Sequence, residues 1–224
     1  MRRFVIGDIH GGYKSLMQCL QKANFNYEED LLINLGDICD GWPDSKKCID
    51  ELLKIKNLIN IIGNHDKWVL EWMTEPREIM WDTQGGKATF HSYVPEKHIE
   101  FLKRSYLWEV IDNKLFVHGG IDPNQKDITK QHKETCLWDR QLLETAIKNH
   151  PRKPNYKWGG FDEIYIGHTS INWMKLYEPT KFCNVWAMDT GGGWGGVLSM
   201  MDIDTKETFI SDFVKGLYPN DSHR

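Results

Sequence analysis

The chain has 224 residues, of which 40% are hydrophobic and 27% charged, and its formal net charge is −4. This length and composition predict one soluble globular domain with its own core and exclude a low-complexity protein. The slightly acidic balance argues against a nucleic-acid scaffold that binds through bulk positive charge, and no apolar run is long enough for a membrane span.

Five short apolar runs punctuate the chain, and each reads as a buried strand. The runs are RFVIGD (3–8), LLINLGD (31–37), LINIIGN (58–64), KLFVHGG (114–120) and EIYIGH (163–168). They are continuous rather than alternating, which is typical of strands covered on both faces. Apolar residues at three- and four-residue steps predict helices at 11–23 and 45–55. Strands that alternate with helices predict a parallel sheet with right-handed crossovers.

The rest of the chain carries weaker signals. An apolar side that includes Trp68 and Trp72 predicts a helix that starts near residue 66, and a second helix is expected at 95–104. His91 and His98 are expected at the surface or on a helix face. The basic, proline-punctuated segment 148–163 predicts a loop, and DTGGGWGG (189–196) predicts a close backbone turn.

The five strand-like runs all stop at residue types that can bind metals. Their ends carry Asp8, Asp37, Asn64, His118 and His168, with His10 just past Asp8. Turn formation explains Asp or Asn after one strand, but it does not require histidine at three places. Ligands gather beyond the carboxyl ends of strands in open α/β sheets, and clustered carboxylates need positive charge between them. We therefore expect one divalent cation, or two that share a carboxylate; the thiolate-free donor set suits Mn²⁺, Fe or Zn.

The blocks around these ends resemble those of a known family. GDIHGG (7–12), GDICD (36–40), GNHD (63–66), HGG (118–120) and GHT (167–169) are similar to the signature blocks of the calcineurin-like metallophosphoesterases. Order and spacing are most similar to phosphoprotein phosphatases and their bacterial and phage relatives, including diadenosine tetraphosphate hydrolases. The matching blocks run from residue 4 to about 191.

This resemblance implies an α/β fold, a four-layer α/β/β/α sandwich, in a single domain over 1–224 with a helical cap-like segment at about 65–105. The second sheet is expected to include the strand-like C-terminal segments 173–177, 184–189, 195–203 and 207–213.

The resemblance also implies a two-metal site. Asp8 and His10 would hold one ion, Asn64, His118 and His168 the other, and Asp37 would bridge them. Mn²⁺ is the expected metal, with Fe, Zn and Mg as alternatives. His65 matches the histidine that protonates the leaving alkoxide, Asp40 the acid that orients it, and Asp189 a residue that supports the metal site.

One position departs from the pattern of phosphoprotein phosphatases. Their bridging block continues with an arginine that grips phosphate, whereas this chain has Gly41 followed by Trp42. Arg140, in a Trp-x-Arg stretch similar to that of bacterial and phage members, is the candidate replacement, and the alternative is a surface arginine paired with Asp139 or Glu144. Trp42 is either a stacking surface for substrate or a wall residue, and Asn64 is a further candidate substrate contact.

The predicted function is hydrolysis of phosphomonoesters by a serine/threonine (or tyrosine) protein phosphatase-like enzyme. The alternative is a dinucleoside polyphosphate hydrolase of the diadenosine tetraphosphate type. A catalytically inactive binding module is disfavoured, because all six ligand types and His65 are present. The expected partner is a phosphorylated protein or a nucleotide, not a membrane. Five cysteines without a CxxC pair, and no apolar leader, predict a cytoplasmic protein. The oligomeric state is left open.

Overall fold

The first sheet is built around the three N-terminal strands. In a computed structural model, which describes residues 1–74, 82–86, 89 and 96–221, these strands run parallel, as predicted. They are β1 (Arg3–Ile6), β2 (Leu31–Asn34) and β3 (Asn57–Asn60), and they are connected by helices α1 (Tyr13–Lys22) and α2 (Ser45–Leu52).

Two C-terminal strands complete this first sheet. β9 (Ser199–Asp202) pairs antiparallel with β1, and β10 (Thr208–Ile210) pairs with β9, so the order is β10-β9-β1-β2-β3. The prediction that segments 195–203 and 207–213 belong to the second sheet is therefore wrong. Their apolar pattern indicates burial but does not identify which strand each one pairs with.

The second sheet is centred on the fourth and fifth predicted strands, which lie parallel to each other. Its order is β4 (Trp108–Ile111), β5 (Lys114–Val117), β6 (Glu163–Ile166), β8 (Val185–Ala187) and β7 (Thr180–Phe182). The strand predicted at 184–189 is confirmed. The strand predicted at 173–177 is wrong, because the 3-10 turn η3 (Asn172–Met174) and the left-handed Lys175, with φ of 59°, reverse the chain there.

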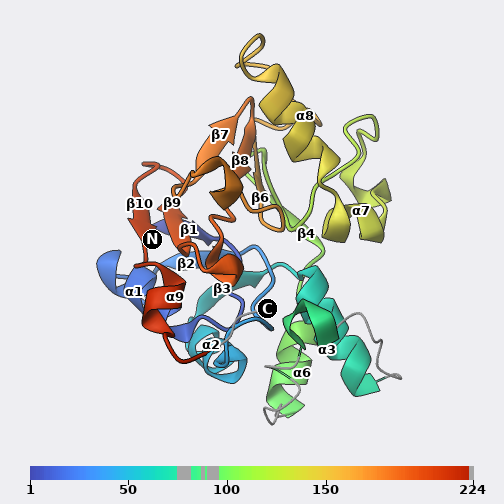
Figure 1. Ribbon diagram of the computed structural model, residues 1–224. Helices are drawn as coiled ribbons and strands as arrows, with labels where there is room; N and C mark the ends of the chain where they lie inside the picture. The colour runs from blue at the N-terminus through green and yellow to red at the C-terminus, as the bar shows by residue number, and fades with distance from the viewer. Residues whose placement is uncertain (75–81, 87–88, 90–95, 222–224) are drawn as a thin grey trace.

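The two sheets pack face to face, with helices outside each (Figure 1). Phe4 and Ile6 point toward α1 and α2, whereas Val5 between them packs with Phe116 of β5 in the core between the sheets. On the other side, Leu115 packs with residues of α8 (Gln141–Asn149). Because neighbouring residues of a strand face opposite ways, these continuous runs are covered on both faces. The four-layer α/β/β/α sandwich is confirmed.

The remaining helices surround this sandwich. They are α3 (Asn64–Thr74), the π-helical turn η1 (Asp82–Gly86), α6 (Glu96–Lys103), the 3-10 turn η2 (Ile128–Lys130), α7 (Lys133–Trp138), the 3-10 turn η4 (Gly192–Trp194) and α9 (Val214–Leu217). The described part of segment 148–163 between α8 and β6 is irregular, as predicted. Within residues 1–74, 82–86, 89 and 96–221, no helix has the length and apolar character needed to cross a bilayer.

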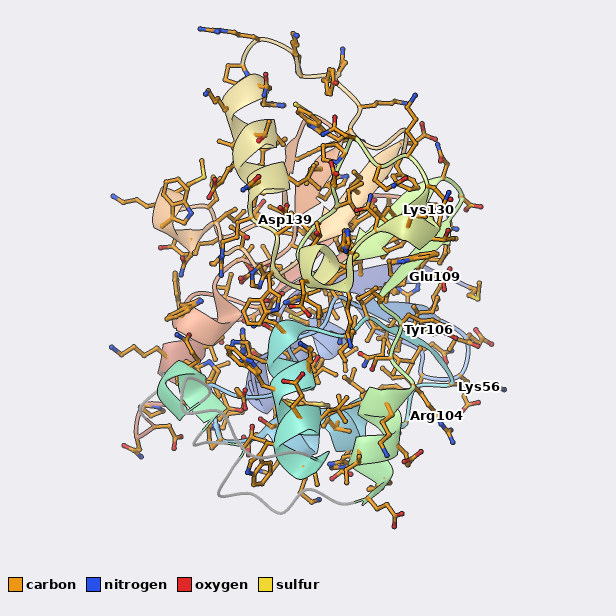
Figure 2. All side chains as sticks on the ribbon, turned by 90° about the vertical axis from the view of Figure 1, so that its right-hand side faces the viewer. Lys56, Arg104, Tyr106, Glu109, Lys130 and Asp139 are labelled. Atoms are coloured by element: carbon orange, nitrogen blue, oxygen red, sulfur yellow. The ribbon has the colours of Figure 1, made fainter. Side chains whose placement is uncertain are left out.

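Helices α3 and α6 lie side by side beyond the edge of the first sheet (Figure 1). From α6 the chain continues through Arg104 and Tyr106 into β4, which contains Glu109 (Figure 2). The backbone of Tyr106 forms hydrogen bonds with Asn60 and Ile62 at the end of β3. His98 of α6 is buried rather than exposed, with its ring nitrogen Nε2 2.9 Å from Asp50 of α2. His91 lies outside the described residues.

Candidate metal centre

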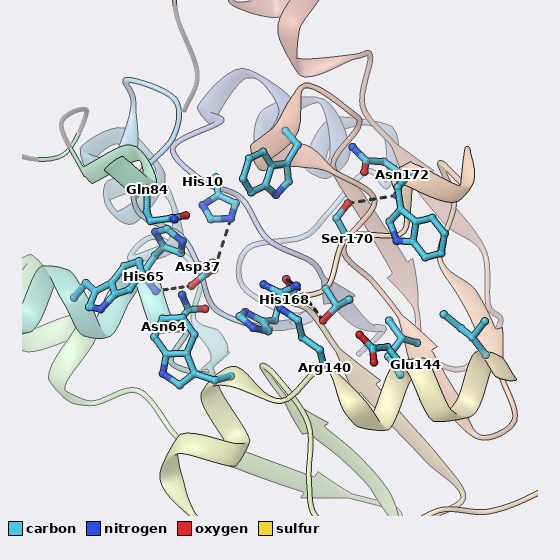
Figure 3. Close-up of a pocket in the computed structure, with 17 residues that line it drawn as sticks. His10, Asp37, Asn64, His65, Gln84, Arg140, Glu144, His168, Ser170 and Asn172 are labelled. Atoms are coloured by element: carbon cyan, nitrogen blue, oxygen red, sulfur yellow. Dashed lines mark hydrogen bonds and ion pairs between the residues drawn. The ribbon is translucent and has the colours of Figure 1, made fainter. Parts of the chain in front are cut away.

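The six predicted metal ligands converge at the carboxyl ends of the central strands. Asp8 and His10 follow β1, Asp37 follows β2, Asn64 begins α3, His118 follows β5 and His168 follows β6. All six side chains are buried. Figure 3 shows His10, Asp37, Asn64 and His168 around one pocket.

Asp37 lies at the centre of this cluster. Its Oδ2 is 3.6 Å from Nε2 of His10 and 3.4 Å from Nε2 of His118. Two groups of potential ligand atoms, each within 4.8 Å of one another, share this carboxylate: His10, Asp37 and His65, and Asp37, His118 and His168. This is the arrangement that a bridging carboxylate requires. The first group contains His65 in place of the expected Asp8, whose Oδ2 lies 3.9 Å from Nε2 of His10.

Backbone carbonyls set the orientation of two of the histidines. Nδ1 of His10 lies 3.2 Å from the carbonyl oxygen of Cys39, and Nδ1 of His118 lies 2.8 Å from that of Leu35. With Nδ1–H donating to these carbonyl oxygens, both Nε2 atoms face the cluster, as metal-binding histidines require.

The loops hold their ligands in a backbone conformation that is costly for residues other than glycine. His10, Asp37 and His168 have φ angles of 47°, 50° and 60°. The left-handed region costs about 1 kcal/mol or more for such residues, and it persists where surrounding contacts hold it. One such contact is the backbone N–H of His168, which donates to the Asp8 carboxylate at 3.0 Å.

The charges within the cluster favour a bound cation. Burial raises the pKa of Asp8 well above its ordinary value, and Asp189 and Asp37 raise it further. Burial also opposes the charge on Asp37, but the facing His118, His65 and His10 outweigh it and hold the pKa of Asp37 well below the usual range. Although burial opposes a charged His118, the Asp37 carboxylate raises the pKa of His118 to about 9. The buried carboxylates thus favour a protonated, positively charged histidine beside them. A bound divalent cation would supply that positive charge instead.

His168 gives a second sign that the donor set fits a metal. Burial, together with His118 and Arg140, lowers its pKa to about 2, so the imidazole is neutral and can present a lone pair from Nε2. That buried nitrogen has no hydrogen-bond partner among the residues that the structure describes. Buried polar atoms are normally paired, and a metal ion is one partner that satisfies such an atom.

His65 and Asp40 form the predicted pair beside the cluster. Nδ1 of His65 lies 2.9 Å from Oδ2 of Asp40, and both residues are buried. The backbone N–H of His65 donates to Oδ1 of Asp37 at 2.9 Å, which fixes the start of α3 against the centre. This contact lets Asp40 orient the imidazole of His65 beside the cluster.

Asp66 has a structural role that its sequence position did not reveal. Its carboxylate accepts hydrogen bonds from the backbone N–H groups of Ile38, Cys39 and Gly63. It thereby joins the loop after β2 to the loop after β3, the two loops that carry Asp37 and Asn64. Asp189 is also buried, and its Oδ1 accepts from Gly191 N–H at 2.8 Å, which shapes the glycine-rich turn.

Arg140 reaches the pocket from the start of α8. Its guanidinium donates to the carbonyl oxygen of His168 at 3.3 Å, and it is exposed. Neither Asp139 nor Glu144 forms an ion pair with it in the described chain. Trp68 and Trp138 line the same pocket, and their ring centroids are 5.1 Å apart.

Trp42 lies in the core, so it is neither a stacking surface for substrate nor a wall residue of the pocket. Its side chain is fully buried, its Nε1–H donates to Gly192 O at 2.8 Å, and it stacks on Tyr218. The substrate-binding prediction for Trp42 is therefore wrong, because no face of its ring reaches the pocket. Gly41 before it has φ of 87° and approaches His10 closely, so this conformation is strained for any other residue.

The pocket extends well beyond the metal centre. Its volume is about 710 Å³, and its lining includes Gln84, Leu143, Ile147, Trp173 and Trp194. Sequence reasoning did not identify these five residues. The sequence feature that could have predicted Trp173 and Trp194 is a tryptophan within a glycine-rich or polar segment, because few apolar neighbours are present there to bury its ring.

Comparisons with known proteins match most of the chain to phosphoesterases. The family model described as calcineurin-like phosphoesterase matches residues 1–178. Serine/threonine-protein phosphatase 1 of Salmonella typhimurium is 27% identical over 89% of this chain and 91% of its own length. A symmetrical bis(5'-nucleosyl)-tetraphosphatase of Wigglesworthia glossinidia brevipalpis is also 27% identical, over 93% of this chain and 98% of its own.

The fold has close counterparts among solved structures. One structure, of a protein provisionally described as a diadenosine tetraphosphatase, covers 93% of this chain and 92% of its own, with a TM-score of 0.70 and 17% identity. A metallophosphoesterase from Sphaerobacter thermophilus covers 94% and 87%, with a TM-score of 0.59 and 16% identity. At these identities the likeness concerns the fold.

Proposed function

The chain belongs to the calcineurin-like phosphoesterase family, and on that premise we propose that it releases phosphate from phosphomonoesters at a two-metal centre. The observation that carries the proposal is the convergence of the buried ligand set on Asp37, beside a hydrogen-bonded His65–Asp40 pair. Carboxylate, amide and imidazole donors gathered at the ends of parallel strands suit divalent cations. A phosphate ester is anionic and resists attack by a nucleophile, and such cations offset its charge.

In this proposal Asp8 and His10 would hold one ion, Asn64, His118 and His168 would hold the other, and Asp37 would be shared between them. When bound, the two ions neutralise phosphoryl oxygens and lower the pKa of an attacking water. Mn²⁺ is the proposed metal, with Fe, Zn and Mg as alternatives, because the donors are oxygen and imidazole without thiolate.

The chain's own residues perform the proton transfer and the positioning. Nδ1–H of His65 donates to Asp40, so the opposite ring nitrogen faces the leaving oxygen and gives it a proton. Arg140 grips nonbridging phosphate oxygens, which a planar guanidinium binds two at a time. The Asn64 amide, held 2.9 Å from Nε2 of His118, contributes a further substrate contact.

Two substrate classes compete for this site. Phosphoserine, phosphothreonine or phosphotyrosine side chains of proteins are the first candidates, in keeping with the phosphatase relative. Dinucleoside polyphosphates are the second, supported by the tetraphosphatase relative and by a pocket of about 710 Å³, far larger than one phosphate group needs.

We also propose that residues 1–224 act as a single domain, with α3 and α6 as the cap-like segment, and that the protein works in the cytoplasm without a nucleic-acid scaffold. All five cysteines are buried thiols, which suits a reducing compartment.

The test of the activity is manganese-dependent release of p-nitrophenol from p-nitrophenyl phosphate. We expect turnover with Mn²⁺ and none after chelation, and readdition of metal should restore it. Turnover that survives exhaustive chelation contradicts the two-metal proposal, and absence of turnover with every candidate metal contradicts the phosphoesterase proposal.

Arg140→Ala tests the phosphate clamp. Since a charge-assisted bidentate contact is lost, we expect kcat/KM for p-nitrophenyl phosphate to fall about 10- to 100-fold, with bound metal unchanged. Arg140→Lys restores only part of the rate, because an ammonium cannot grip two oxygens in the same geometry. Arg152→Ala, an exposed arginine in the loop after α8, is the matched control. Unchanged kinetics in Arg140→Ala remove this residue from the site.

A further inference from the structure

The pocket continues past Arg140 into a second region that the proposed metal chemistry does not use. In Figure 3, His10, Asn64 and His65 lie on one side of Arg140, and Glu144, Ser170 and Asn172 lie on the other. We call this second region the distal arm. Its lining residues are Leu143, Glu144, Ile147, Ser170, Asn172 and Trp173.

Two tryptophans expose their rings to this pocket. Trp173 is 71% exposed and Trp194 is 49% exposed, and both line the pocket. Among the tryptophans that the structure describes, these two alone are exposed; the others are buried or half-buried. Exposed indole surface forgoes the favourable free energy of burial, about 25 cal/mol per Å² of apolar area, so two such rings at one pocket indicate a ligand-binding surface.

Close glycine contacts constrain the backbone of the two turns that carry these tryptophans. Gly191, before η4, packs against Asn172 of η3 so closely that an added Cβ would lie 2.3 Å from Nδ2 of Asn172. Gly193 packs equally closely against the ring of His10, where a Cβ would lie 2.2 Å from Cδ2. Trp194 therefore stands where the distal arm meets the metal centre, and the turn that carries Trp173 leans on the same glycine-rich segment. A constrained backbone reduces the loss of conformational freedom when a ligand binds.

The charges along the pocket specify the kind of ligand. Arg140, between the metal centre and the distal arm, has no carboxylate partner in the described chain. Its guanidinium can therefore donate to a second anionic group beside the phosphate at the metals. Glu144, in the distal arm, likewise forms no ion pair among the described residues and offers a carboxylate to a hydrogen-bond donor. Leu143 and Ile147 of α8 supply apolar surface beside it.

We propose that the distal arm binds the base of a nucleotide whose terminal phosphate lies at the metal centre. A nucleotide presents, in order, phosphate groups for the metals and Arg140, a flat ring for the two indoles, and ring or exocyclic N–H donors for Glu144. A phosphorylated peptide brings one phosphate and only by chance an aromatic donor at the right distance. The inference rests on the proposed phosphoesterase function and narrows its substrate class to nucleotides.

The test compares two ligands that differ in the nucleoside. Calorimetric titration of the manganese-loaded full chain is made with α,β-methylene-ADP and with methylenediphosphonate, which lacks ribose and base. Base stacking on an aromatic side chain predicts that the nucleotide analogue binds about 10- to 100-fold more tightly. In Trp173→Ala and Trp194→Ala that ratio falls about tenfold, and the phenylalanine variants at the same positions recover most of it.

Tyr106→Ala is the control, because Tyr106 is 52% exposed on the connection between α6 and β4, outside this pocket (Figure 2). Both indoles are at the surface, so their removal leaves the core intact, and an unchanged thermal midpoint checks this. Equal affinities for the two ligands in the unmodified protein overturn the proposal. So does a ratio that both tryptophan variants leave unchanged.

Titration with a phosphopeptide tests the competing ligand class. A phosphopeptide that binds more tightly than α,β-methylene-ADP, and loses affinity in the same variants, assigns the distal arm to peptides and overturns the nucleotide assignment. Base-dependent binding without hydrolysis of p-nitrophenyl phosphate contradicts the phosphoesterase proposal alone. Hydrolysis without base-dependent binding contradicts only the distal-arm proposal.

Discussion

Asp37 illustrates how much one side chain does in this site. One of its oxygens accepts the backbone N–H of His65, and the other faces the Nε2 atoms of His10 and His118. The residue itself has a left-handed backbone, so its loop must be held by its neighbours. Asp66 does much of that holding through N–H groups on either side of the centre.

His65→Gln tests whether this histidine protonates the leaving group. Loss of a general acid lowers kcat by about 10²- to 10⁴-fold for phosphoserine, whose alkoxide is a poor leaving group. The loss for p-nitrophenyl phosphate is much smaller, because p-nitrophenolate departs without a proton. Steady-state kinetics on both substrates provide the measurement.

His132→Gln serves as the matched control, since His132 is exposed at the start of α7. Equal losses on both substrates in His65→Gln indicate a positioning or metal-binding role, which the nearness of His65 to His10 and Asp37 makes the main competitor.

At the scale of elements, Glu163 at the start of β6 connects the two sheets. It accepts hydrogen bonds from Lys181 of β7, from Trp186 of β8 and from Lys206, which lies between β9 and β10 of the first sheet. Burial opposes the carboxylate charge, but these donors outweigh it and lower the pKa of Glu163 to about 2. The ionised form therefore stabilises the packing of the sheets.

Glu163→Gln tests this connection through the pH dependence of stability. The folded pKa of about 2 lies below the ordinary 4.5, so the stabilisation is complete above pH 4.5 and is lost as the pH falls toward 2. We expect the variant to lower the free energy of unfolding by roughly 2 kcal/mol at pH 7, as for hydrogen bonds to a charged group. The difference shrinks between pH 4.5 and 3.

Urea unfolding across this pH range measures the difference, with Glu29→Gln, an exposed glutamate, as control. A deficit that stays constant down to pH 3 means that the charge of Glu163 does not stabilise the fold.

At the scale of the molecule, the metal centre lies where the two sheets meet. Asp8, His10, Asp37 and Asn64 follow strands of the first sheet, whereas His118 and His168 follow strands of the second. Ions held by both sets, as proposed, would link the two halves of the sandwich. Anything that binds only the folded state stabilises it, so metal content and stability are coupled.

We expect Mn²⁺ at a hundredfold excess over its dissociation constant to add about 2.7 kcal/mol, or roughly 5–10 °C in thermal midpoint for a chain of this size. Calorimetric scans with metal and with chelator measure the shift. His168→Ala removes a ligand from the second sheet and reduces the shift, whereas Arg152→Ala does not. An undiminished shift in His168→Ala would falsify its assignment as a ligand.

The local sequence determined the strands and the residues at their ends. Continuous apolar runs such as 3–8 and 163–168 became strands buried on both faces, and the helices at 11–23 and 45–55 formed as expected. The residues proposed as metal ligands follow strands within each sheet, where the carboxyl ends of parallel strands share an edge, and the packing of the two sheets brings the two sets together. The strands and helices themselves depend on contacts that a short stretch of chain encodes.

Only the tertiary structure decided how distant segments meet. β9 and β10 returned to the first sheet, the ring of Trp42 turned into the core against Tyr218, and Trp173 and Trp194 came to line one pocket with Arg140. Hydrophobic periodicity reports that a side chain is buried or exposed, but not its partner. That choice depends on packing between residues far apart in the chain, and no local pattern contains it.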